Sequence, residues 1–165
     1  MEKLWSPWRS KYIESFKEES KTGCIFCDAK DQEVQDNRSL IIYKGKYSFV
    51  VLNLYPYNGG HLMVVPYRHL DDFQNLSDDE LSEIMKLTKI SLKALGNESN
   101  PHGFNFGANL GRAAGAGIDT HLHFHIVPRW IGDSNFMPVI GEVKVISQDL
   151  LDLKIKLIMQ FNKLL

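Results

Sequence analysis

The sequence has little of three features that often reveal the class of a protein: cysteine, charge of one sign, and long apolar runs. Two cysteines among 165 residues exclude a disulfide framework of the secreted kind. A formal net charge of −1 argues against a surface that binds nucleic acid or an anionic membrane. No apolar run approaches the roughly 20 residues of a membrane span, and the opening MEKLWSPWRSKY has no signal-peptide core. These absences predict a cytoplasmic protein without nucleic-acid or membrane partners.

The composition and the hydrophobic pattern predict a single α+β domain over residues 1–165. With 44% hydrophobic residues, the chain is long enough to bury a substantial core. Strands are expected in a hairpin over 39–54 that turns near Gly45, and over 61–66, 103–110 and the segment from 121. Helices are expected over 6–16, 76–96 and 147–165, with a glycine-rich loop over 111–119. The expected architecture is a mainly antiparallel sheet of about five strands with helices packed on one face.

The best-defined predicted helix has recognisable signals at both ends. Ser77 and Glu80 have the spacing of a capping box, in which each residue satisfies a backbone donor of the other. Gly96 follows the last periodic apolar residue and is expected to end the helix.

Half of the six histidines occur in the segment HLHFHIVPRW, residues 121–130. In a β-strand, side chains alternate between faces, so His121, His123 and His125 would share one face with rings about 7 Å apart. Leu, Phe and Ile would then pack on the core from the other face. A solvated strand could carry this pattern, but lysine, threonine or glutamate would fill a solvated face more easily. A histidine ladder therefore favours metal binding, proton transfer or nucleophilic chemistry.

The two cysteines form a CxxC motif, GCIFC, at Cys24 and Cys27. The pair could be redox-active, two inert buried thiols, or half of a zinc site. A thioredoxin-like pair needs a helix start after a strand, and the polar N-terminal context argues against it. Zinc needs four ligands, so histidines would have to supply the other two. The available ones are His61, His69, His102 and the three of the ladder.

Several segments together resemble the histidine triad superfamily. HLHFHIVPR fits its signature of three histidines alternating with apolar residues, and NGGHLMVVPYRHL resembles its glycine–histidine strand followed by a Pro-x-x-His turn. Within the superfamily the chain is similar to the bacterial diadenosine tetraphosphate phosphorylases. LWSPWR, VVLNLYPYNGGHLMVVPYR, PHGFNFGANLG and HLHFHIVPRW resemble segments of that subgroup in the same order, over nearly the whole chain.

The resemblance implies a nucleotide-processing enzyme of the histidine triad fold, built as a homodimer. By analogy His123 is the nucleophile, and His121 joins Cys24, Cys27 and His69 in a structural zinc site. Relatives often have a hydroxyl residue four positions before the first histidine, where this chain has Gly117. Any contact to phosphate at that position would come from backbone N–H groups alone.

Imidazole chemistry supports the same role for His123. A neutral imidazole attacks the α-phosphorus of a nucleotide without first losing a proton, and the resulting phosphoramidate has a good cationic leaving group. The other ring nitrogen needs an acceptor, for which we expect a carbonyl of the NLGRAAG loop. His125 and His61 are expected to reach toward the phosphate chain and stabilise its charge.

Further side chains are predicted to bind the nucleotide. In the glycine-rich loop, backbone N–H groups would form an anion nest, helped by an amide and a guanidinium. The residues concerned are Asn109, Gly111, Arg112, Gly115 and Gly117. Asn53 is expected at the ribose hydroxyls by analogy, although an asparagine that ends a strand explains it nearly as well. Phe26 is either a base-stacking ring or part of the core, and Trp130 matches a tryptophan near the active site of the phosphorylase subgroup. Arg129 is equally a surface charge or a substrate contact.

Three functions of different classes remain open at this point. The first is nucleotidyl transfer through His123, with orthophosphate as acceptor (diadenosine tetraphosphate giving ADP and ATP) or with water as acceptor, in hydrolysis of dinucleoside polyphosphates or nucleoside phosphoramidates. The second is a hydrolytic zinc enzyme whose metal is held by the histidine ladder itself. The third is a zinc-stabilised module that binds nucleotides without chemistry.

Overall fold

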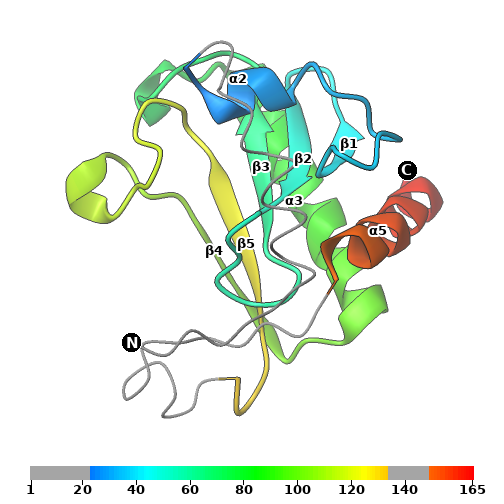
Figure 1. Ribbon diagram of the computed structural model, residues 1–165. Helices are drawn as coiled ribbons and strands as arrows, with labels where there is room; N and C mark the ends of the chain where they lie inside the picture. Colours follow the sequence, from blue (N-terminus) through cyan, green and yellow to red (C-terminus); the bar gives the residue numbers. More distant parts are fainter. Residues whose placement is uncertain (1–22, 134–148) are drawn as a thin grey trace, which may run out of the picture.

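The computed structural model describes residues 23–133 and 149–165, which form a five-stranded antiparallel sheet with helices (Figure 1). The order across the sheet is β1-β2-β3-β5-β4, and every neighbouring pair is antiparallel. The strands are β1 Ile41–Lys44, β2 Ser48–Leu52, β3 Leu62–Pro66, β4 Gly103–Gly107 and β5 Phe124–Arg129. This architecture confirms the predicted α+β fold. The helix expected over 6–16 lies outside the described residues.

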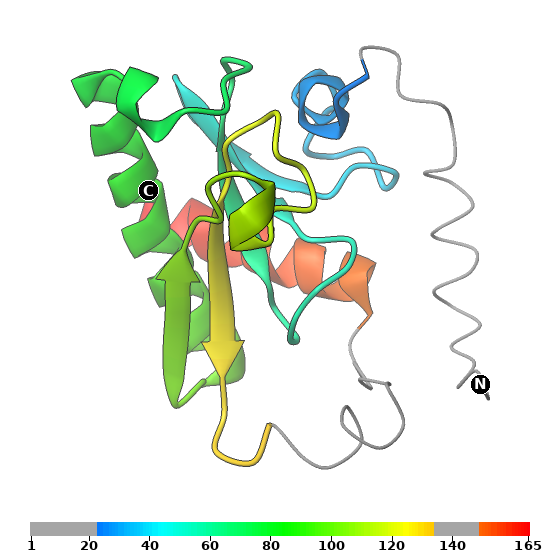
Figure 2. The same cartoon turned by 90° about the vertical axis from the view of Figure 1, so that its left-hand side faces the viewer.

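Two long helices pack against the sheet and against each other. Helix α3, Asp78–Ser99, contacts β2, β3 and β5, and helix α5, Leu150–Leu164, contacts β1 and α3. A short helix, α2, Ile25–Ala29, lies on the other side of the strands from α3 (Figure 2). Two 3-10 turns, η1 Phe73–Asn75 and η2 Arg112–Ala114, lie in the connections. Within the described ranges, no helix combines the length and the apolar character that crossing a bilayer requires.

The hairpin of β1 and β2 turns at the predicted position and is fastened to α3 by two carboxylates, of which Asp79 accepts a hydrogen bond from the Tyr47 hydroxyl at 3.1 Å. Glu83 accepts hydrogen bonds from the backbone N–H groups of Lys46, Tyr47 and Ser48 at 2.6–2.8 Å. A Cβ at Gly45 would lie 2.8 Å from the carbonyl oxygen of Ser48, so the turn needs glycine. The buried strand β2 is thereby placed against α3.

Helix α3 begins as predicted but ends later. The capping box of Ser77 and Glu80 is present in both directions, which confirms the predicted start. The predicted stop at Gly96 is wrong, because the helix continues to Ser99 and Asn100 closes it in the left-handed conformation, at φ 44°. Asparagine tolerates that conformation, and Pro101 cannot continue a helix.

The register of β5 places the histidine segment at the end of the central strands. His125 pairs with Met63 of β3 on one side and with Gly107 of β4 on the other. The strand begins at Phe124, so His121 and His123 precede it instead of lying within it as predicted. A hydrogen bond from the Leu122 N–H to the Leu70 carbonyl, at 2.7 Å, anchors this preceding segment.

Candidate functional site

Four histidine side chains are buried where β3 and β5 meet. They are His61, His121, His123 and His125, with exposed fractions of 0, 1, 5 and 9%. Neighbouring rings touch: the His123 and His125 centroids are 4.8 Å apart, and those of His61 and His125 are 5.0 Å apart. The ladder is therefore a packed group of imidazoles, and the solvated-strand interpretation is wrong.

The tautomer of His123 follows from its hydrogen bond. Nδ1 lies 2.8 Å from the carbonyl oxygen of His121, which can only accept, so Nδ1 holds the proton. In the neutral ring, Nε2 then has the lone pair. The acceptor is the carbonyl two residues earlier and not one in the NLGRAAG loop, because the extended segment before β5 brings its own backbone under the ring. This is the arrangement that a nucleophilic imidazole requires.

His61 and His125 form a directional hydrogen-bonded pair. The backbone N–H of Tyr57 donates to Nδ1 of His61 at 3.0 Å, so the His61 proton is on Nε2. Nε2 in turn lies 2.9 Å from Nδ1 of His125 and donates to it. The proton of a neutral His125 is consequently on its own Nε2. Among the described residues this buried Nε2 has no hydrogen-bond partner.

A buried donor without a partner, beside a ring nitrogen that has a free lone pair, indicates where a ligand oxygen would bind. His125 meets this description, since its Nε2–H is available and its ring contacts that of His123. His61 does not reach toward a ligand as predicted, because it is fully buried and both of its ring nitrogens are engaged within the protein. Any effect of His61 on a ligand would pass through His125, to which its Nε2 donates.

Burial keeps the rings of His61, His123 and His125 uncharged. Desolvation, followed by the neighbouring His125 and His123, lowers the pKa of His61 to about 3. Desolvation and the neighbouring His123 lower the pKa of His125 to about 4. The pKa of His123 is also lowered by burial, although its hydrogen bond to the His121 carbonyl opposes the shift. At neutral pH, His123 is an uncharged base beside an uncharged donor.

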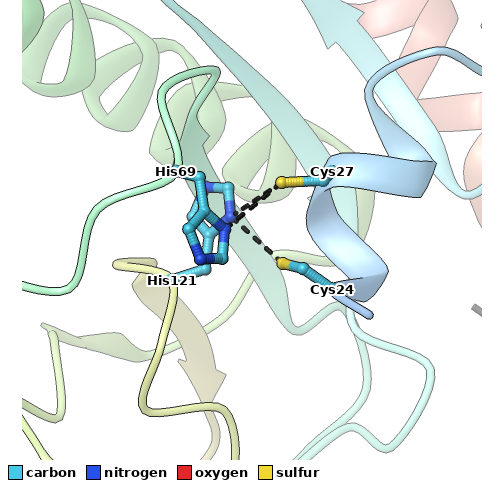
Figure 3. A group of neighbouring side chains, drawn as sticks. All are labelled: Cys24, Cys27, His69 and His121. Carbon is cyan, nitrogen blue, oxygen red and sulfur yellow. Dashed lines mark hydrogen bonds between the residues drawn. The ribbon is translucent and has the colours of Figure 1, made fainter. Parts of the chain in front are cut away.

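Next to the ladder, two cysteines and two histidines converge on one point (Figure 3). Their ligand atoms, from Cys24, Cys27, His69 and His121, all lie within 4.8 Å of one another. Sγ of Cys24 and Nδ1 of His121 are 3.3 Å apart, as are Sγ of Cys27 and Nδ1 of His69. Metal–ligand bonds of about 2.3 Å to sulfur and 2.0 Å to nitrogen place tetrahedral ligand atoms roughly 3.3–3.8 Å apart. The cluster can therefore hold a metal ion.

The hydrogen bond of His121 prepares it as a ligand. Nε2 lies 3.0 Å from the carbonyl oxygen of Pro66 and donates to it, which leaves the lone pair on Nδ1, the atom that faces both sulfurs. Backbone carbonyls fix metal-binding histidines in this way. Within the described ranges, this is the only close group of three or more potential metal ligands, and His123 and His125 are not in it. A metal held by the three-histidine ladder is not supported.

Helix α2 joins the two groups. Cys24 occupies the N-cap position and Cys27 lies one turn later, and both thiols face His69 and His121 (Figure 3). Between them in sequence, Phe26 is only 2% exposed and contacts the rings of His121 and His123, at centroid distances of 5.4 and 4.9 Å. At this burial Phe26 packs in the core, which favours the second of its two predicted roles, and its stacking on a base stays a prediction. Phe26 belongs to the core.

The glycine-rich loop lies in the connection from β4 to β5. The connection leaves β4 after Gly107, the pairing partner of His125, and reaches the histidine segment at His121. Gly111 and Gly115 have positive φ angles of 79° and 91°, which require glycine. Arg112 is 87% exposed at its side chain and pairs with Asp119 at 3.3 Å. Gly117 is exposed and Asn109 half-buried.

Of the remaining residues predicted to contact the nucleotide, one lies near the histidine ladder and two lie far from it. Asn53 is close to the ladder, with Nδ2 3.2 Å from Nδ1 of His61. Trp130 lies beyond the other end of β5, five residues or roughly 16 Å from His125, with its indole N–H on the Ser99 carbonyl. Arg129 is held by Asp133 and Asn105. Within the described part of one chain, Trp130 and Arg129 are therefore not at the site.

Sequence patterns did not identify Tyr57 or the carbonyl of Pro66. Tyr57 contributes its N–H to His61 and packs its ring on His61 and His125. Tyr57 lies only four residues before His61, and this closeness in sequence could have indicated a contact. Loop residues have no regular repeat, however, so the side on which the Tyr57 ring lies was not predictable. The Pro66 carbonyl had no signal, because its partner His121 is 55 residues away.

Comparisons with known proteins place the chain among relatives of the same fold. The HIT domain model matches residues 34–130, a range that contains the five strands and all six histidines. The chain is similar to the AP-4-A phosphorylase of Mycobacterium tuberculosis, with 42% identity over 156 residues, 92% of this chain and 80% of the relative. It is also similar to an adenosine 5'-monophosphoramidase of Candida albicans, with 34% identity over 114 residues, 67% of this chain and 72% of the relative.

A solved structure agrees with the observed fold. The crystal structure of a Zn-bound histidine triad family protein from Mycobacterium smegmatis has a TM-score of 0.69 and 22% sequence identity. The match covers 88% of this chain and 97% of that one. At this identity the likeness shows the common fold.

Proposed function

The chain belongs to the HIT family, and on this premise we propose that it transfers nucleotidyl groups through a covalent intermediate on His123. The proposed reaction is phosphorolysis of diadenosine tetraphosphate to ADP and ATP. One observation supports it most directly: the Nδ1–H of His123 is bound to the His121 carbonyl, which leaves Nε2 as a buried, unprotonated nucleophile. The similarity to an AP-4-A phosphorylase over 92% of the chain supports the choice of substrate.

In the first step, Nε2 of His123 attacks the α-phosphorus of the dinucleotide. A P–N bond forms and the P–O bond to the rest of the phosphate chain breaks, so ATP leaves with the electron pair. The Nε2–H of His125, which has no hydrogen-bond partner among the described residues, is the donor proposed for that departing oxygen. His61 holds this donor in place through Nδ1 of His125. The positive charge on the His123 ring is stabilised by the His121 carbonyl.

In the second step, an oxygen of orthophosphate attacks the same phosphorus. The P–N bond breaks, its electrons return to Nε2 of His123, and ADP is released. Backbone N–H groups around Gly111 and Gly115 are proposed to bind phosphate oxygens, because this loop joins the site at both ends. Asn53, beside His61, is proposed to hold a ribose hydroxyl.

Hydrolysis is the second candidate, with water in place of orthophosphate. The similarity to an adenosine 5'-monophosphoramidase over 67% of the chain favours this alternative. Both reactions share the first step, so the geometry of His123 and His125 fits both. The acceptor that reaches the intermediate decides between them.

We further propose that Cys24, Cys27, His69 and His121 bind a structural zinc ion. Thiolate and imidazole are the ligands that zinc prefers in such sites, and four protein ligands leave no open position for a substrate. The ion would join α2 to the segment before β5 and so hold Phe26 against His123. A homodimer is also proposed. The outer edge of β4 is unpaired in the described sheet and would be the place for a second sheet to add.

The test of the reaction uses the full-length protein and diadenosine tetraphosphate, with and without orthophosphate, with products separated by ion-exchange chromatography. We expect ADP and ATP to form only when phosphate is present. AMP and ATP without phosphate would indicate the hydrolase, and no turnover with either acceptor would contradict nucleotidyl transfer from this substrate.

The nucleophile is tested with His123→Gly, which should reduce turnover by about a thousandfold or more. His102→Gln is the matched control, because His102 is an exposed histidine outside the ladder. Rapid acid-free quenching with labelled substrate should show label on wild-type protein and none on the glycine variant. Full activity of His123→Gly would exclude His123 as nucleophile.

A further inference from the structure

Tyr57 lies over the His61–His125 pair in the loop between β2 and β3. Its ring centroid is 4.6 Å from that of His61 and 5.5 Å from that of His125, with interplanar angles of 39° and 32°. The residue is 51% exposed, so one side of the ring faces the imidazoles and the rest faces solvent. The same residue donates its backbone N–H to Nδ1 of His61. No other described residue provides both a ring contact and a hydrogen bond to this pair.

We propose that Tyr57 is a positioning residue whose ring excludes water from the His61–His125 pair while its N–H, together with the side-chain amide of Asn53, sets the His61 tautomer. The consequence is at Nε2 of His125, which stays protonated and, within residues 23–133 and 149–165, without a hydrogen-bond partner, so that it is the donor to the site. The effect on turnover rests on the proposed function. The effect on tautomers does not.

Water at the His61–His125 pair would make the positions of the ring protons ambiguous. If solvent reached His61, it could donate to either ring nitrogen, and the chain of donors from Tyr57 through His61 to His125 would lose its single direction. His61 is fully buried although it is the last residue of the loop before β3. The ring of Tyr57 covers the His61 ring on the side of this loop. Removing the ring therefore opens a short path from solvent to both imidazoles.

The groups around the His61–His125 pair are uncharged, so burial is the main factor that sets the pKa values of the two rings. His123 faces His125 from the segment before β5, the phenol of Tyr57 faces both rings from its loop, and the neutral Asn53 contacts His61. The strand neighbours of His125 are Met63 on β3 and Gly107 on β4. Among the described residues, only histidines act on the pair electrostatically. No carboxylate of residues 23–133 or 149–165 acts on the pair to compensate if water enters.

The experiment compares wild type, Tyr57→Phe and Tyr57→Ala as full-length, ¹⁵N-labelled proteins. Long-range ¹H–¹⁵N spectra report the tautomer and the protonation of each imidazole without substrate. In wild type and Tyr57→Phe, we expect His61 and His125 to be single Nε2–H tautomers that stay neutral below pH 6. In Tyr57→Ala we expect mixed tautomers and titration midpoints raised by about one pH unit or more.

Kinetics provide the second measurement. The acid limb of kcat should move to higher pH in Tyr57→Ala and return to the wild-type position in Tyr57→Phe, with KM changed little. Tyr57→Ser provides a second uncovered variant should the alanine variant fold poorly, and near-UV circular dichroism checks the fold of each.

The outcomes separate the two proposals. Unchanged tautomers and midpoints in both uncovered variants would overturn the role of Tyr57, and an increase in KM alone would assign the ring to substrate contact instead. If the spectra change as expected while no variant, wild type included, turns over diadenosine tetraphosphate, the positioning role stands and the proposed reaction fails.

Discussion

At the scale of single residues, the site depends on histidines that are kept neutral by burial. His61 and His125 give up hydration and gain one hydrogen bond to each other, with their pKa values lowered to about 3 and about 4. In an unfolded chain both rings would titrate near 6.5. The folded state therefore excludes protons that the unfolded state binds, and stability is linked to pH over the interval between these values.

The sign of this linkage gives a prediction. The stabilising contribution is complete above pH 6.5 and is lost as the pH falls toward 4, because only the unfolded chain gains protons there. At pH 5.5 each ring lowers the free energy of unfolding by about 1.4 kcal/mol relative to neutral pH. Urea denaturation at pH 7.5 and 5.5 measures the difference. In His61→Gln the loss should be smaller by about 1.4 kcal/mol, the contribution of one ring, and an equal loss in both proteins would contradict the assignment.

At the scale of elements, two glycines have opposite effects on stability. Gly96 lies inside α3, and a Cβ there would meet no atom within 4 Å. Gly60 has φ +77°, and a Cβ there would lie 3.0 Å from Leu95 and 3.2 Å from Pro128. Gly96 therefore only adds conformational entropy to the unfolded chain, whereas Gly60 allows the loop before His61 to approach α3 and β5.

Substitution by alanine should separate the two positions. Gly96→Ala is expected to stabilise the protein by about 0.5–1 kcal/mol, because it relieves a helix interior of its least favourable residue except proline. Gly60→Ala should destabilise it by about 1 kcal/mol or more, through its positive φ and the close contacts. Thermal and urea unfolding measure both. A destabilising Gly96→Ala would mean that α3 does not continue past residue 96.

At the scale of the whole molecule, the cluster of Cys24, Cys27, His69 and His121 joins parts that are remote in sequence. Its contacts span 42 to 97 residues and connect α2, the loop after β3 and the segment before β5. Four ligand atoms, two thiol sulfurs and two imidazole nitrogens, are brought within 4.8 Å of one another. We therefore expect metal binding to contribute to folding as well as to the site.

Metal removal tests this expectation. Elemental analysis should find about one zinc ion per chain, and chelation should lower the free energy of unfolding by about 2.7–4.1 kcal/mol when free zinc had exceeded its Kd by 100- to 1,000-fold. Cys24→Ser should reduce both metal content and stability more than the rate of chemistry in the remaining folded protein. His102→Ala is the control and should retain the metal. Absence of zinc from freshly purified wild type would contradict the structural site.

Local spacing was sufficient to predict the elements and the kind of chemistry. The alternation of histidine with apolar residues, the CxxC motif and the capping box at Ser77 are each encoded within a few positions. Patterns of this kind determine which face or terminus a residue occupies, because they follow from the repeat of the strand and the helix. The end of α3 was mispredicted since Gly96 and Asn100 are both acceptable stops by local rules, and packing continued the helix.

The tertiary structure decided which groups meet and which nitrogen of each ring holds the proton. His121 faces two sulfurs because Pro66 accepts from its other nitrogen, and His61 serves His125 because Tyr57 donates to it. It also placed Phe26 in the core and Trp130 at the far end of β5. These outcomes depend on sheet register and on backbone groups far away in sequence. A backbone carbonyl or N–H is the same in every residue, so no sequence pattern shows where it will be used.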